Sequence, residues 1–281
     1  PQREGNLQQI RDFAISSIES GLEGLLLTLW DDDSPHFELY KRGIIGFAND
    51  TWSGDKITKA EFKMAFRQRV FSNKAAEPEF AFIDQLELPV AEWKNVLLKG
   101  NKRNYLMEME SPQEAGLIEL PSVENPGVWS EKFKERVNRA ENMILTCDTI
   151  KIKIKQIKEL TAKNQYMIEV YERVNELAGF TPRLLLLLKL YDQAKDEEQR
   201  LIALDKINYL KKEFFTLKDR LEKTYSKTRV LHKPQDYILD QDHHHHLANQ
   251  TNNFDWQFAA ELLMFEKIDK QLKLDHPKPK G

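Results

Sequence analysis

Residues 150–178 have the sequence IKIKIKQIKELTAKNQYMIEVYERVNELA, and this stretch decides the expected fold. Nine of its positions follow an alternating spacing of four and three residues: Ile150, Ile154, Ile157, Thr161, Asn164, Ile168, Tyr171, Asn175 and Ala178. This spacing places the nine side chains on one face of an α-helix, as in the seam of a coiled coil. Because most of the nine are apolar, the stretch predicts a long helix with one buried face.

A second helical stretch follows a break at Gly179 and Pro182. Thr181 is predicted to cap the new helix, with Pro182 at its first position. Leu184, Leu188 and Tyr191 open this stretch at spacings of four and three. Spacings of three and four resume in its later part, at Ile207, Leu210, Phe214, Leu217, Leu221 and Tyr225. We therefore expect residues 129–229 to form one antiparallel hairpin of two long helices. Its seam either packs within the chain or serves as an oligomerisation surface, and the seam asparagines suit both alternatives because buried Asn can fix register.

The beginning of the chain has a different pattern. Residues 6–20 predict an amphipathic helix between Asn6 as N-cap and Gly21 as the stop. Its expected apolar face consists of Leu7, Ile10, Phe13, Ala14 and Ile18. Residues 24–30 are short and continuously apolar, which predicts a strand buried on both faces, and a helix over about 36–48 follows. One such unit cannot close a sheet, so we expect the remaining strands upstream of this chain.

These patterns define a fold class that is mainly α. Residues 1–55 are expected to form a terminal strand and helix unit of an α/β (TIM-type) barrel. Residues 56–127 form an irregular connecting region with short helices, among them one over 58–72 and a possible β-hairpin over 104–120. Residues 128–281 contain the helical hairpin, a polar loop over 232–252 and a last helix over about 254–272.

Composition excludes several classes of function. The 42 basic and 45 acidic residues give a net charge of -3, so no basic excess points to a nucleic-acid partner. Cys147 is the single cysteine, which rules out an intrachain disulfide and a zinc site built on cysteines. No run approaches the ~18 apolar residues of a membrane-spanning helix.

The first group of candidate site residues comes where the expected strand ends. Trp30 is followed by Asp31, Asp32 and Asp33, and the active sites of α/β barrels lie at this end of the strands. A Trp ring offers a flat apolar face to a sugar, and carboxylates accept hydrogen bonds from its hydroxyl groups. The alternative is an acidic N-cap run that satisfies the free N–H groups of the next helix.

Residues 19–33, ESGLEGLLLTLWDDD, resemble the last barrel strand of glycoside hydrolase family 20, the β-N-acetylhexosaminidases. The resemblance implies that Trp30 forms a wall of the sugar pocket and that Asp32 binds two sugar hydroxyls. Asp31 and Asp33 are further substrate-binding candidates, although the common family pattern has Gly in place of Asp31. The resemblance also implies an N-acetylhexosamine-containing glycan as partner, no cofactor, and a periplasmic or extracellular location.

Family 20 enzymes use the acetamido group of the substrate as nucleophile, and an adjacent Asp-Glu pair on an earlier strand assists it. No segment of this chain resembles that strand. The resemblance therefore implies the C-terminal region of a glycosidase, inactive alone, that contributes a pocket wall and a helical appendage. The alternative from another class is a non-enzymatic helical module for interaction or oligomerisation.

A second polar constellation lies at residues 240–246, DQDHHHH. Imidazoles and carboxylates bind zinc, nickel or copper, but consecutive histidines point in different directions, so at most two, such as His243 and His245, could share one ion. We expect a solvated polar loop here, with a metal site as the alternative.

Overall fold

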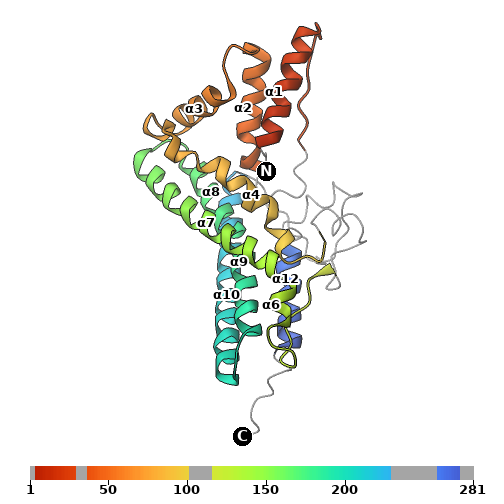
Figure 1. Ribbon diagram of the computed structural model, residues 1–281. Helices are drawn as coiled ribbons and strands as arrows, with labels where there is room; N and C mark the ends of the chain where they lie inside the picture. The colour runs from red at the N-terminus through yellow and green to blue at the C-terminus, as the bar shows by residue number, and fades with distance from the viewer. Residues whose placement is uncertain (1–3, 30–36, 101–115, 229–257, 273–281) are drawn as a thin grey trace. The chain divides into compact units, whose positions relative to one another are not determined.

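The computed structural model describes residues 4–29, 37–100, 116–228 and 258–272 of the chain (Figure 1). The described residues are mainly helical, as expected, and their β-structure consists of an isolated antiparallel bridge between Leu98 and Leu117. The chain divides into two compact units. The first unit comprises Pro1–Ala91 and Thr146–Asn175, and the second comprises Glu92–Leu145 and Glu176–Gly281.

The first unit begins with α1 (Glu4–Glu19), which packs against α2 (Lys41–Ser53). The two helices approach closely at Gly46, where an added Cβ would lie 3.0 Å from Cδ1 of Leu7. Gly21 ends α1 with a φ of 71°, which confirms the predicted stop. Asn6 lies inside α1 rather than at its N-cap, so that prediction is wrong; in the first helical turn the backbone N–H groups are free, and a polar residue is tolerated there without capping.

Short helices follow α2 and complete this part of the first unit. They are α3 (Lys59–Val70), η2 (Lys74–Ala76), η3 (Pro78–Phe80) and α4 (Phe82–Glu92), after the turn η1 (Phe37–Tyr40) that precedes α2. A capping box starts α3, in which Thr58 Oγ1 accepts from Glu61 N and the Glu61 carboxylate accepts from Thr58 N. The helix predicted over 58–72 is confirmed with nearly the same bounds.

The strand predicted over residues 24–30 is not formed in its described part. Residues 24–29 have no regular secondary structure, and Leu26 is 83% exposed. A strand is stable only when a neighbour satisfies its N–H and C=O groups, and no described segment pairs with residues 24–29. The barrel interpretation of this segment therefore rests on sequence.

The seam over residues 150–178 is buried as predicted, except at Asn164. It belongs to two helices rather than one arm, α7 (Lys134–Leu160) and α8 (Gln165–Ala178). Asn175 Nδ2 donates to Cys147 O at 2.8 Å, and Lys158 pairs with Glu172 at 2.5 Å. The contact nearer the end of α8 is made to the earlier residue of α7, so α8 lies antiparallel to the C-terminal half of α7.

The turn between α7 and α8 uses two of the polar seam residues. Thr161 Oγ1 donates to Phe71 O and Asn164 Nδ2 donates to Val70 O, both at 2.6 Å, at the C-terminal end of α3. Asn164 has a φ of 50°, a left-handed conformation that Asn adopts more readily than most residues. The chain therefore turns at residues 161–164. Gly179 is the single residue between α8 and α9, and its backbone has right-handed helical φ and ψ angles.

The second unit contains η4 (Lys94–Val96), α6 (Val128–Lys132), α9 (Phe180–Asp192), α10 (Glu197–Tyr225) and α12 (Ala259–Gln271). Helices α9 and α10 pack against each other across the connection 193–196. Their core holds a cluster of aromatic rings centred on Phe214, which contacts Phe180, Phe258 and Phe265. The predicted last helix is confirmed by α12 over its described residues.

The expected capping role of Thr181 is wrong. Thr181 is the second residue of α9, fully buried, and its Oγ1 donates to Trp93 O at 2.6 Å. A tertiary acceptor has thus replaced the local one. Residues 129–229 also differ from the predicted two-arm hairpin, because α6 to α10 divide this range into helices of unequal length.

Candidate functional site

The predicted sugar-site residues Trp30, Asp31, Asp32 and Asp33 lie outside the described residues. His243 and His245 also lie outside them. Within the described ranges, no group of three or more His, Cys, Asp or Glu side chains could hold a metal ion. No described helix is long and apolar enough to cross a membrane.

Arg11 of α1 joins this helix to α2 and to the loop that follows α2. Arg11 Nη1 donates to Asp50 Oδ1 at 2.8 Å, and its Nη2 donates to Ile57 O at 2.5 Å. Asp50 is 3% exposed, so this charge-assisted contact is shielded from water. The contact between Arg11 and Asp50 joins α1 to α2, and in the sequence the candidate residues 30–33 come after α1 and before α2.

Helix α2 carries different residues on opposite faces. Gly43, Gly46 and Asp50 are buried on one face, and Gly46 contacts α1 through Leu7. Ile45 and Trp52, seven residues apart, share the opposite face, where Trp52 is 91% exposed. An exposed apolar face opposite a packed one indicates a helix with room for a second neighbour.

Other large apolar side chains of α1 and of the segment that follows it are also exposed. They are Phe13 and Ile18 of α1, and Leu22 and Leu26 of the following segment. The expected apolar face of α1 is therefore buried only in part, at Leu7 and Ala14, because α2 covers those positions.

One adjacent Asp-Glu pair occurs in the described chain, and its setting is not catalytic. Asp196 is the N-cap of α10, and its Oδ1 accepts from Gln199 N at 2.8 Å. Glu197 pairs with Arg200 at 3.0 Å in the first turn of the same helix. Both carboxylates therefore serve helix initiation, away from any strand end.

The first unit also contains a buried ionic cluster that no sequence pattern predicted. Arg42, 4% exposed, donates to Asp84 Oδ1 and to Glu87 Oε1, and Lys63 pairs with Asp84 at 2.8 Å. Burial alone would lower the pKa of Arg42, but Asp84 and Glu87 outweigh it and raise that pKa. Burial would raise the pKa of Asp84, whereas Arg42 and Lys63 lower it.

Tyr171 lies in the same unit beside this cluster. Burial raises the pKa of its phenol, so the group stays neutral, and its ring packs edge-on against Phe82 at 5.5 Å. Arg42, Glu87 and Tyr171 border a cavity of about 20 Å³, which has room for about one water molecule. This volume excludes a sugar, and we interpret the cluster as structural.

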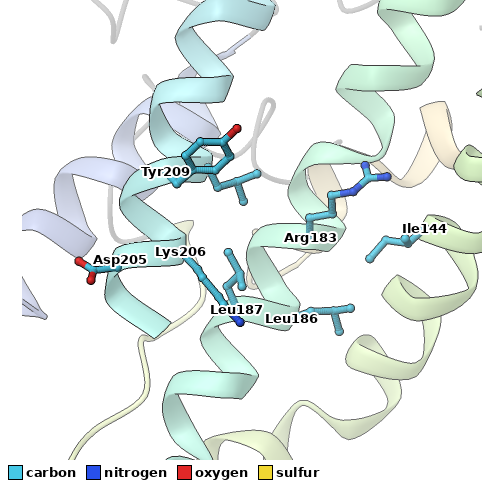
Figure 2. A pocket seen from close by; sticks show the side chains of 8 residues that line it. Ile144, Arg183, Leu186, Leu187, Asp205, Lys206 and Tyr209 are labelled. Carbon is cyan, nitrogen blue, oxygen red and sulfur yellow. The ribbon is translucent and has the colours of Figure 1, made fainter. Parts of the chain in front are cut away.

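An apolar groove with a volume of about 630 Å³ lies in the second unit (Figure 2). Three helices line it: α7 with Ile144, α9 with Arg183, Leu186 and Leu187, and α10 with Asp205, Lys206, Tyr209 and Leu210. Five consecutive leucines, 184–188, place apolar side chains all around α9, so some face the core and others face this groove. That run was the available sequence signal for the groove.

The polar side chains at the groove point in different directions. Figure 2 shows Lys206 and Tyr209 directed from α10 toward α9, whereas the Asp205 carboxylate points away from the groove. Tyr209 is 66% exposed, so a large ring protrudes beside the hollow. The groove lacks a cluster of polar groups aimed at one point, as catalysis would need, and has the character of a docking surface.

Comparison of the chain with protein families, with curated proteins and with solved structures found no match.

Proposed function

We propose that this chain is the C-terminal region of a glycosidase that acts on β-linked N-acetylhexosamine. In the parent enzyme, residues 1–55 would supply the last strand and helix of a TIM-type barrel. The helices of residues 128–281, with their hairpin-like pairs, would form an appendage. The ESGLEGLLLTLWDDD sequence of residues 19–33 supports the enzyme class.

The observation that carries the proposal is the two-faced character of α2. A helix of a TIM-type barrel packs on strands with one face and on neighbouring helices with another. Gly46 of α2 contacts α1 through Leu7, while Ile45 and Trp52 expose an apolar face on the other side. Leu22 and Leu26, exposed in the preceding segment, would be covered by the same barrel strands.

The chemistry would divide between this chain and the upstream strands. The substrate acetamido group would act as nucleophile, oriented by an Asp-Glu pair on an earlier strand. Trp30 would stack on the apolar face of the pyranose, and Asp32 would accept hydrogen bonds from two hydroxyls. Asp31 and Asp33 would extend the acidic mouth of the pocket or cap the helix that follows.

The test is Asp32→Asn in the parent enzyme. A charged hydrogen bond contributes ~1.5–3 kcal/mol, so kcat/KM should fall by roughly one to two decades while the melting temperature stays unchanged. Asp33→Ala tests the capping alternative at the neighbouring acid, because alanine cannot accept the backbone N–H bonds of a helix N-terminus. If Asp33 is a cap, this variant lowers the melting temperature and leaves kcat/KM unchanged. If Asp32→Asn lowers only the melting temperature, the capping interpretation replaces the sugar site.

A second candidate function is a non-enzymatic helical interaction module, and the apolar groove of the second unit favours it. The two candidates differ in what precedes Pro1. An adjacent Asp-Glu pair at a predicted strand end in the preceding coding sequence supports the glycosidase, and its absence supports the module.

A further inference from the structure

We infer that two copies of this chain associate through the groove face of α10, with the helices crossing antiparallel near Tyr209. The inference names the partner for the second candidate function, the interaction module. It is independent of whether the chain belongs to a glycosidase.

The groove face of α10 carries both a protruding group and a hollow. Ile202, Lys206, Tyr209 and Glu213 recur at spacings of three and four, so they share one face of the helix. Tyr209 protrudes beside the groove that Leu186 and Leu187 help to line (Figure 2). A two-fold interface requires one patch to present both complementary features, and this face does so.

The charges on this face are also self-complementary. Lys206 and Glu213 are seven residues apart, both exposed, and neither makes a hydrogen bond or ion pair within the described residues. In an antiparallel crossing centred between Tyr209 and Leu210, Lys206 of each copy lies opposite Glu213 of the other. Tyr209 of each copy then lies opposite Leu210, which lines the groove.

This arrangement favours a second copy over an unrelated amphipathic helix. An unrelated amphipathic helix would contact the apolar residues of the groove and would not require opposite charges at Lys206 and Glu213. With a second copy, a crossing midway between Lys206 and Glu213 brings each of these residues opposite its counterpart, so the same two charges form two equivalent contacts.

The experiment measures the mass of the full chain by sedimentation equilibrium as the protein concentration is lowered. The unchanged chain should be a dimer that dissociates on dilution. Lys206→Glu and Glu213→Lys, made separately, place like charges opposite each other and should each raise the dissociation constant by about tenfold or more. Asp219→Lys, at an exposed position of α10 outside the groove lining, is the matched control and should leave the dimer unchanged.

Mixing the two weakened variants provides the decisive arm. Lys206→Glu and Glu213→Lys chains restore opposite charges in both contacts, so the mixture should form heterodimers with an affinity near that of the unchanged chain. Tyr209→Ser, at an exposed position, should also weaken the dimer, with circular dichroism confirming that its helices are intact. A monomer at every concentration, a dimer unaffected by both charge reversals, or a mixture that stays monomeric overturns the inference, whatever the outcome of the glycosidase assay.

Discussion

At the residue scale, Arg42 shows how this chain stabilises a charge away from water. The guanidinium is buried, and two carboxylates, from Asp84 and Glu87 of α4, accept its hydrogen bonds. Each of these residues had an unremarkable sequence setting, since charged residues make up 31% of the chain. Residue type alone could not distinguish them from solvated surface charges.

Replacing Arg42 should therefore destabilise the protein strongly. Arg42→Met removes the guanidinium that Asp84 and Glu87 both bind, and removing one partner of a buried ion pair costs ~3–5 kcal/mol. The free energy of unfolding, measured by urea denaturation, checks this value. Lys134→Met is the control, because Lys134 pairs with Glu131 at an exposed position, and exposed pairs contribute only about 0–1 kcal/mol. Equal losses in the two variants would contradict the structural role of the cluster.

At the element scale, the heptad-like spacing identified buried positions better than it identified helix ends. Ile150, Ile154 and Ile157 are at most 1% exposed, as the spacing predicts. The end of α7 was missed because Thr161 and Asn164 occupy seam positions yet bind carbonyl oxygens of the α3 terminus. Periodicity indicates which face is buried, while a turn depends on acceptors that only folding brings near.

The burial of the α7 seam leads to a test within one helix. Ile157→Asp places an unpaired charge among apolar side chains, which should cost several kcal/mol and lower the melting temperature markedly. Ile152→Asp in the same helix is the control, because Ile152 is 62% exposed and should tolerate a charge. A melting temperature that is unchanged in Ile157→Asp would show that the seam does not stabilise the fold.

At the scale of the whole molecule, we expect the 281-residue chain to have no hexosaminidase activity by itself. Its described Asp196-Glu197 pair is engaged at the start of α10, and general acid–base assistance contributes ~10²–10⁴-fold to such rates. Release of a chromogenic leaving group from a β-N-acetylglucosaminide is the measurement. The expectation is contradicted if the chain releases the leaving group faster than a buffer blank and if one acid-to-amide substitution in this chain abolishes that release.

The sequence by itself determined the helical class, the stop of α1 at Gly21, the start of α3 at Thr58 and the buried face of residues 150–178. These features depend on local periodicity and on backbone preferences within a few residues. Only the tertiary structure decided the turn at 161–164, the role of Thr181, the Arg42 cluster and the groove beside Tyr209. The physical reason is distance along the chain: Thr161 and Thr181 find their acceptors 90 and 88 residues away, at Phe71 and Trp93, and no local pattern encodes such a partner.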